Sequence, residues 1–226
     1  MARRNPKETA RGEALSGESA QEAPPARLVV GISGASGAIL GVRLLQALKT
    51  LPVETHLIVS RSAELTIACE TDMKVPEVRA LADASYAVGD LAAPISSGSF
   101  PTLGMVIAPC SIRTMAEIAT GVTSSLLTRA ADVTLKERRR LVLMLRETPL
   151  HTGHLRNLLA LSEMGAIVAP PVPAFYARPK TIEEMVDHSV GRVCDLFGLD
   201  TGTVKRWRGP ALAPRRRRGG LESEEE

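Results

Sequence analysis

Short apolar runs alternate along this chain with longer segments of helical periodicity, and this alternation constrains the fold more than any other feature. Strands are expected at residues 27–33, 53–60, 104–108, 141–145 and 166–169. Because these runs are apolar throughout, they are typical of a parallel sheet that helices cover on both faces. The sequence therefore predicts an α/β protein with a three-layer, Rossmann-like fold and a parallel sheet of about six strands.

Helices are expected between and after these strands, at residues 38–49, 62–70, 112–120, 124–138, 153–164 and 181–197. The intervening segment 72–100 is rich in Pro, Ser and Gly and is predicted to be irregular. Residues 1–26 show no apolar period and are predicted to form a disordered N-terminal arm. Residues 209–226 are predicted to form a disordered charged tail, which leaves one domain at residues 27–208.

Composition excludes several classes of function. The 226 residues are 44% apolar and 23% charged, as in an ordinary globular protein. The net charge is only +3, and the basic run at 215–218 is nearly balanced by the acidic run at 224–226, so no nucleic-acid partner is expected. No apolar run is long enough to span a bilayer. Three widely spaced cysteines lack metal-ligand spacing and favour a reducing cytoplasm.

The first strand runs into a turn of small residues, GISGASG at residues 31–37. Small residues let a backbone approach a phosphate, and the following helix offers free N–H groups and the positive end of its dipole. The spacing matches neither the G-x-G-x-x-G dinucleotide motif nor the P-loop. Ser33 and Ser36 add hydroxyl groups that a plain turn does not need. The turn is therefore a candidate phosphate site, with a tight strand–helix turn that binds nothing as the alternative.

Polar residues also follow the other strands, at the edge of the sheet where ligands bind in parallel α/β folds. Ser60 follows the second strand, and PCSIRT at 109–114 follows the third, where a simple N-cap at Ser111 is the alternative reading. Arg146 and Glu147 follow the fourth strand. These positions are candidates for contacts with a charged ligand.

Several cations are candidates for a second anion site. Arg129 and Lys136 are seven residues apart and therefore lie on one helical face. Arg192 lies in the last expected helix, and taken singly each of these residues is an ordinary surface charge. Together with Arg146 they could surround a phosphate, which is best bound by several converging donors.

In combination and in this order, the motifs resemble those of the UbiX-type flavin prenyltransferases, within the wider group of homo-oligomeric flavin-containing Cys decarboxylases. The resemblance runs from about residue 27 to about residue 207. It rests on GASG at 34–37, ETD at 70–72, SGSF at 97–100, PCS at 109–111, RAADV at 129–133, LKE at 135–137, RETPL at 146–150, HL at 154–155, Asn157 and FY at 175–176. The domain at 27–208 is thereby expected to be a flavoprotein domain.

The resemblance implies a function for individual residues. It implies that FMN is bound by Gly34, Ala35, Ser36, Ser60, Ser111, Ile112, Arg113, Thr114 and Arg146. It implies that a prenyl phosphate is bound by Arg129, Lys136, Tyr176 and Arg192, some of them across a subunit boundary. The implied catalytic residues are Ser36, Glu70, Glu147 and Lys136. Many relatives have Lys or a small residue where this chain has Arg113, whose fork geometry differs from that of Lys.

The implied reaction joins the dimethylallyl group of dimethylallyl monophosphate to N5 and C6 of reduced FMN, with loss of phosphate. The product is prenylated FMN, which a UbiD-type decarboxylase would receive. No Asp-rich, magnesium-binding motif occurs in the sequence, so a metal-independent transferase is expected, in which cations stabilise the departing phosphate. The resemblance also implies a homo-oligomer, a dodecamer, in the cytoplasm.

Two alternatives stay open at this point. FMN-dependent decarboxylases of cysteinyl peptides or of phosphopantothenoylcysteine resemble this fold, but they carry a catalytic His after the second strand, and here ETD at 70–72 stands near that region. A non-catalytic FMN-binding protein is the second alternative. The residues that argue against it are Lys136, Arg146, Glu147 and Tyr176, because a carrier of FMN needs no second phosphate site.

Overall fold

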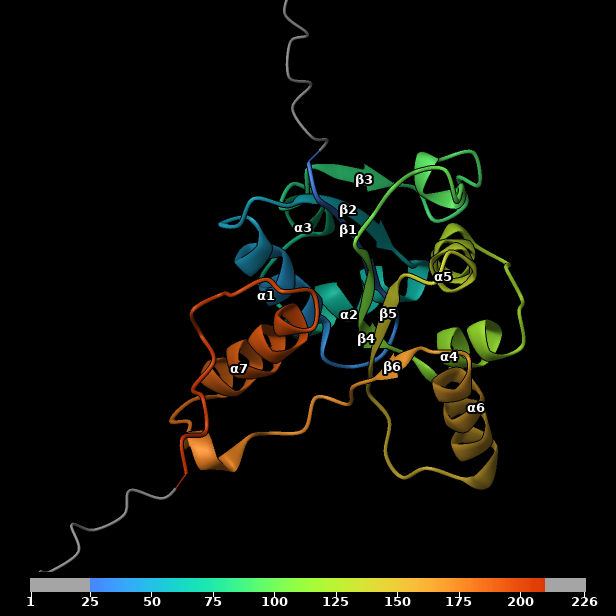
Figure 1. Ribbon diagram of the computed structural model, residues 1–226. Helices are drawn as coiled ribbons and strands as arrows, with labels where there is room; N and C mark the ends of the chain where they lie inside the picture. Colours follow the sequence, from blue (N-terminus) through green and yellow to red (C-terminus); the bar gives the residue numbers. More distant parts are fainter. Residues whose placement is uncertain (1–24, 210–226) are drawn as a thin grey trace, which may run out of the picture.

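One sheet of six parallel strands runs through the protein, which the computed structural model describes over residues 25–209 (Figure 1). The strand order is β3-β2-β1-β4-β5-β6. The strands are β1 (Arg27–Ile32), β2 (Glu54–Val59), β3 (Ala84–Tyr86), β4 (Gly104–Cys110), β5 (Arg140–Leu145) and β6 (Ile167–Val168). Apart from residues 25, 26 and 209, the predicted arm and tail lie outside the described residues. Within residues 25–209, no helix is long and apolar enough to cross a membrane.

Helices cover both faces of the sheet and give the three layers that the sequence predicts (Figure 1). One layer holds α1 (Ala38–Leu48), α2 (Arg61–Glu70), α3 (Val75–Arg79) and α7 (Ile182–Asp195). The other holds α4 (Ile112–Ala119), α5 (Leu126–Lys136) and α6 (Thr152–Glu163). Successive strand residues face opposite layers, so Val30 packs in the first core and Val29 in the second. The buried residues of β1, β4 and β5 are therefore apolar.

The segment 72–100, which the sequence predicted to be irregular, contains regular structure, and that prediction is wrong. It holds α3, the edge strand β3 and the 3-10 turn η1 (Pro94–Ser96). Strand β3 has only three residues and lies at the edge of the sheet, where it pairs with a strand on one side only. It therefore shows no buried apolar run. It is fixed by tertiary contacts, among them a hydrogen bond of 2.9 Å between the Tyr86 hydroxyl and His56 Nδ1. With β3, the predicted sheet of about six strands is confirmed.

The connections place a crevice between β1 and β4. From β1 the chain runs outward through β2 to β3, and it then returns to add β4 on the opposite side of β1. The connections that leave these two neighbouring strands therefore diverge, which opens a ligand-binding crevice beyond their carboxyl ends. Gly41 brings α1 close to the sheet there, because a Cβ at this position would lie 2.4 Å from the carbonyl oxygen of Ala108.

Ser33 ties the carboxyl ends of β1 and β4 together. Its hydroxyl donates a 2.8 Å hydrogen bond to the carbonyl of Pro109 and accepts one of 2.7 Å from the N–H of Ser111. The side chain is buried. The hydroxyl is thus committed to the scaffold, and the interpretation of Ser33 as an extra donor for a phosphate is wrong.

Candidate functional site

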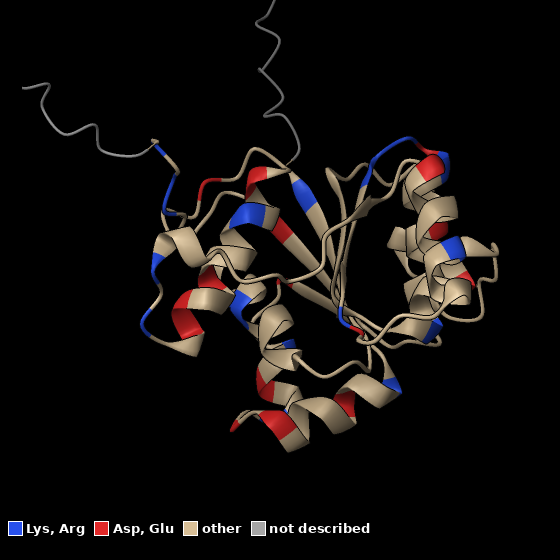
Figure 2. Cartoon of the chain, turned by 90° about the horizontal axis from the view of Figure 1, so that it is seen from below, with Lys and Arg blue, Asp and Glu red and all other residues tan. Residues whose placement is uncertain are grey.

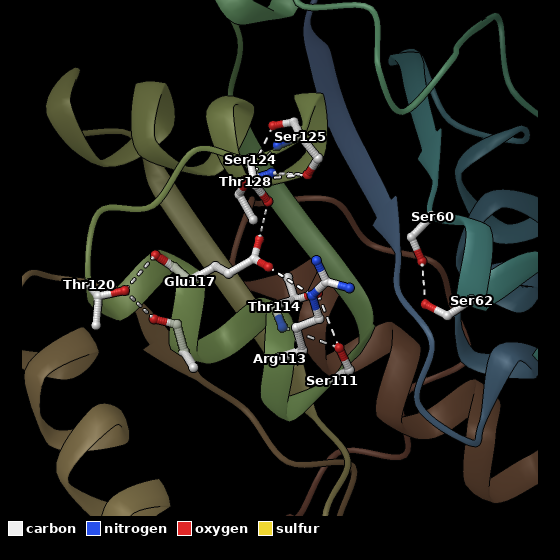
Figure 3. A network of polar contacts seen from close by, with 11 residues as sticks. Ser60, Ser62, Ser111, Arg113, Thr114, Glu117, Thr120, Ser124, Ser125 and Thr128 are labelled. Carbon is white, nitrogen blue, oxygen red and sulfur yellow. Dashed lines mark hydrogen bonds and ion pairs between the residues drawn. The ribbon is translucent and has the colours of Figure 1, made fainter.

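A pocket of about 770 Å³ lies beyond the carboxyl ends of β1, β2 and β4. Its lining includes five of the residues expected to bind FMN: Gly34, Ser60, Ser111, Arg113 and Thr114. The remaining lining residues are Arg61, Ser62, Leu65, Val88, Gly89, Glu117, Ser124, Ser125, Leu127 and Thr128. Strand ends that are far apart in sequence therefore meet at one hydroxyl-rich cavity, which Figure 3 shows from close by.

Three helices begin at this pocket, and a serine caps each of them. Ser60 Oγ accepts from an N–H in the first turn of α2 at 3.1 Å, and Ser111 Oγ and Ser125 Oγ do the same for α4 and α5 at 3.3 Å. The N-cap reading of Ser111 is thus confirmed. Helix N-termini carry partial positive charge and spare N–H donors, so three of them around one cavity favour an anionic ligand.

The start of α1 differs from the other three helix starts, because a carboxylate of the chain already occupies it. Glu70 Oε2 accepts hydrogen bonds from the N–H groups of Gly37 at 2.7 Å and Ala38 at 3.0 Å. These two N–H groups belong to the turn that the sequence predicted as a phosphate site. Partial burial acts to raise the pKa of Glu70, but these bonds, one from Ser36 and the charge of Arg146 outweigh it and lower the pKa.

Four other residues expected to bind FMN lie outside the lining of the pocket. Ser36 and Arg146 lie beside Glu70 and help to lower its pKa. The three residues form one polar group at the start of α1. Ala35 is buried, and Ile112 packs against the second core. Of the expected FMN residues, five thus line the pocket, Ser36 and Arg146 lie in the group around Glu70, and Ala35 and Ile112 belong to neither.

Glu147 is exposed, although the sequence placed it at the mouth of a buried strand. Its Oε1 accepts a hydrogen bond of 2.9 Å from the N–H of the next residue, Thr148. Within the described residues it forms no ion pair. Glu147 is therefore free to act on a ligand or a neighbouring subunit.

The four residues expected to bind the prenyl phosphate are split between the two faces of the sheet. Tyr176, in the 3-10 turn η2 (Phe175–Ala177), and Arg192 of α7 line one cavity of about 330 Å³. Arg129 and Lys136 lie on α5, in the opposite layer (Figure 1). Basic residues accordingly occur on helices at both sides of the sheet (Figure 2). One copy of the chain does not bring the four residues together.

Sequence reasoning missed several residues of the pocket. Ser124 and Ser125 stand directly before an apolar run, with Thr128 three residues after Ser125, which is an N-cap signal that could have found them. Nothing in the sequence indicated Glu117, because a single charged residue on an amphipathic helix normally lies on its solvent-exposed face. Its place at the pocket comes from its partners across space.

The comparisons with known proteins agree with this geometry. The flavoprotein family model matches residues 16–194. The chain is 58% identical over 183 residues to a probable UbiX-like flavin prenyltransferase of Bacillus subtilis, covering 81% of this chain and 90% of that protein. It is 56% identical to the flavin prenyltransferase UbiX of Escherichia coli K12, covering 81% of this chain and 98% of that protein. The chain belongs to the UbiX family of flavin prenyltransferases.

Solved structures of UbiX proteins share this fold. A crystal structure of AnUbiX (PadA1) in complex with FMN and dimethylallyl pyrophosphate has a TM-score of 0.81 at 54% identity, covering 82% of this chain and 98% of that one. A dodecameric, FMN-dependent UbiX-like decarboxylase from Escherichia coli O157:H7 has a TM-score of 0.80 at 54% identity, covering 81% of this chain and all of that one. The predicted family and the predicted Rossmann-like fold are confirmed.

Proposed function

We propose that this member of the UbiX family is a flavin prenyltransferase that joins a dimethylallyl group to reduced FMN. The observation that carries the proposal is the cavity where three helix N-termini meet beyond the sheet, in a chain more than half identical to flavin prenyltransferases. Peptidyl-cysteine decarboxylase EpiD has a TM-score of only 0.54 at 16% identity, a likeness that concerns the fold alone. The prenyltransferase reading is therefore favoured over the decarboxylase alternative.

The residues of the pocket fit FMN. A Cβ at Gly34 would lie 2.3 Å from the side chain of Ser62. Because glycine has no Cβ, the backbone at residue 34 approaches the first turn of α2 closely at the cavity. Arg113 supplies guanidinium donors and Thr114 a hydroxyl donor at the start of α4, which suit a phosphate monoester, while the Ser111 hydroxyl donates to Thr114 Oγ1 at 3.1 Å and so fixes that hydroxyl group. We place the FMN phosphate there, because Glu70 occupies the start of α1. Bound reduced FMN supplies the nucleophile of the reaction.

The polar group beside α1 is suited to handling protons. Two backbone N–H groups donate hydrogen bonds to Glu70, and its pKa is lowered. The carboxylate is therefore ionised at neutral pH and accepts hydrogen bonds. Ser36 lies beside Glu70 and helps to lower its pKa, so its hydroxyl can orient or relay a proton. Glu147 is exposed and follows the carboxyl end of β5, at the edge of the sheet where the pocket lies, so it can approach a bound ligand. We assign Glu70 and Glu147 to proton transfer and Ser36 to a supporting role.

Phosphate departure requires positive charge where negative charge develops. Arg129, Lys136 and Arg192 supply that charge and Tyr176 a hydroxyl group. Arg129 and Arg192 also contact carboxylates, at 2.8 Å to Asp132 and 2.7 Å to Asp195. These contacts leave further guanidinium N–H groups for a phosphate. We propose a monophosphate donor, and offering the monophosphate and the diphosphate separately decides between them.

The prenyl-phosphate site is completed by a second copy of the chain. Arg129 and Lys136 lie in one helical layer and Tyr176 and Arg192 in the other, so one copy offers two half-sites. The segment that carries Tyr176 also exposes Val172 and Phe175, at 71% and 73%. Exposed apolar side chains of this size favour a protein interface. The protein is therefore a homo-oligomer, and we propose a dodecamer, as in the relative described above.

The product, prenylated FMN, would pass to a UbiD-type decarboxylase. We further propose that the protein works in the cytoplasm. Its described cysteines are free, and burial raises the pKa of Cys110 and Cys194 to about 12, so these thiols stay protonated. Free thiols are typical of a reducing compartment, and cell fractionation checks this location.

The deciding experiment is anaerobic incubation of the purified protein with reduced FMN and dimethylallyl monophosphate, followed by mass spectrometry of the released flavin. We expect a flavin that is heavier than FMN by one prenyl group. Unmodified FMN after prolonged incubation with either donor would contradict the proposed function.

A further inference from the structure

Glu117 joins two helix starts at the wall of the pocket. Its Oε1 accepts a hydrogen bond of 2.8 Å from Nε of Arg113 on α4, and its Oε2 accepts one of 2.7 Å from the hydroxyl of Ser124, just before α5 (Figure 3). Both carboxylate oxygens are thus engaged, one by each element. The carboxylate fixes Arg113 to a part of the chain that does not belong to its own helix.

The two partners differ in exposure. The side chain of Glu117 is 18% exposed, whereas that of Arg113 is 84% exposed. Burial acts to raise the pKa of Glu117, but the bonds from Ser124 and Arg113 outweigh it, and the pKa is lowered. The anchor is therefore charged and fixed at neutral pH, while the arginine that it holds projects into the solvent of the pocket.

The contact also sets the direction of the guanidinium group. Glu117 bonds to Nε, which leaves the two terminal nitrogens of Arg113 without a partner among residues 25–209. Figure 3 shows these nitrogens turned toward the side of the pocket where Ser60 and Ser62 lie. This terminal edge carries the paired N–H groups that bind a phosphate through two parallel hydrogen bonds.

We propose that Glu117 is a positioning residue for the phosphate of FMN. It holds Arg113 by Nε so that the terminal edge of the guanidinium faces a phosphate monoester bound at the start of α4. An unanchored arginine with this exposure would have to lose its rotamer freedom on binding, and the carboxylate removes that cost in advance. The inference rests on the proposed function for the placement of the FMN phosphate.

Repulsion acts in the opposite direction, because Glu117 is itself an anion near the proposed phosphate. If repulsion prevailed, removing its charge would tighten the binding of FMN. Both of its oxygens accept hydrogen bonds, one of them from the cationic guanidinium of Arg113, and the surrounding solvent screens the remaining field. Positioning should therefore outweigh repulsion, so the sign of the effect is itself a test.

The test compares the affinities of FMN and riboflavin, measured by quenching of flavin fluorescence, in the full-length protein. Riboflavin lacks the phosphate and reports on every other contact. In Glu117→Gln we expect FMN affinity to fall about 5- to 20-fold, the scale of one charge-assisted hydrogen bond, with riboflavin affinity unchanged. In an Arg113→Ala background the same substitution should change FMN affinity less than about twofold, because the residues act as one unit.

Glu64→Gln is the matched control. Glu64 also pairs with an arginine, Arg79 at 3.0 Å, but it does not line the pocket. We expect it to leave both flavin affinities unchanged. If Glu117→Gln fails to fold, Ser124→Ala removes the second anchor and should weaken FMN about 2- to 5-fold while sparing riboflavin.

Each of three results in the binding measurements would overturn the inference: equal losses for FMN and riboflavin, unchanged or tighter FMN binding in Glu117→Gln, or a full effect in the Arg113→Ala background. Turnover separates this inference from the proposed function. If the wild-type protein makes prenylated FMN, and wild type and Glu117→Gln have the same KM for FMN, only the role of Glu117 is refuted. A wild-type protein that makes none defeats the prenyltransferase proposal, and the binding measurements still decide the role of Glu117.

Discussion

Glu70→Gln tests how the start of α1 is held. Glu70 Oε2 accepts from the N–H groups of Gly37 and Ala38 at 2.7 and 3.0 Å, so a negative charge stands on a helix N-terminus. The amide oxygen of Gln can keep a hydrogen bond but not the charge. Hydrogen bonds to a charged group contribute about 1.5–3 kcal/mol each and neutral ones about 0.5–1.5. The helix dipole adds about 0.3–1 kcal/mol.

The side chain is exposed in the single chain, so the lower ends of these ranges apply. We expect Glu70→Gln to lower the free energy of unfolding by about 1–2 kcal/mol at pH 7. The pKa of Glu70 is lowered in the folded protein from an ordinary value of 4.5. Its contribution is therefore complete above about pH 4.5 and is lost as the pH falls through the lower, folded-state pKa.

Urea unfolding at pH 7 and at a series of acidic pH values measures this. The difference between wild type and variant should shrink steadily below about pH 4.5. Glu147→Gln is the control, since the one side-chain bond of Glu147 within the described residues goes to the adjacent N–H of Thr148. A difference that is absent at pH 7, or that stays constant on acidification, would refute the assignment of Glu70 as the charged anchor of α1.

Four further substitutions address catalysis and folding. Glu147→Gln should keep FMN, change the free energy of unfolding by less than about 0.5 kcal/mol and slow turnover about 10²- to 10⁴-fold, and an unchanged rate would remove Glu147 from the mechanism. Lys136→Ala and Arg192→Ala should each impair prenyl transfer by about 2–4 kcal/mol while FMN affinity holds, and kinetics with wild-type turnover would exclude that residue. Gly104→Ala should destabilise the fold by about 2–4 kcal/mol, because φ is +140° and a Cβ would lie 2.1 Å from the carbonyl oxygen of Arg140; an unchanged urea midpoint would contradict this.

The central strands and the helices that flank them could be predicted from the sequence. Strands such as β1 and β5 are buried on both faces, so their composition alone identifies them. The short edge strand β3 could not be predicted, because it is held by pairing with β2 and by the hydrogen bond between Tyr86 and His56. Local composition reports burial well, but it does not report contacts between distant segments.

The same limit applies to the site. The sequence alone determined which residue types follow the strands, and the strand periodicity placed Gly34, Ser60 and Ser111 at one edge of the sheet. Only the tertiary structure decided how their donors are used. It put Glu70 on the start of α1, tied Ser33 into the scaffold and divided the prenyl-phosphate residues between the two helical layers. Hydrogen-bond partners across tens of residues are fixed by packing, and packing is a property of the folded chain as a whole.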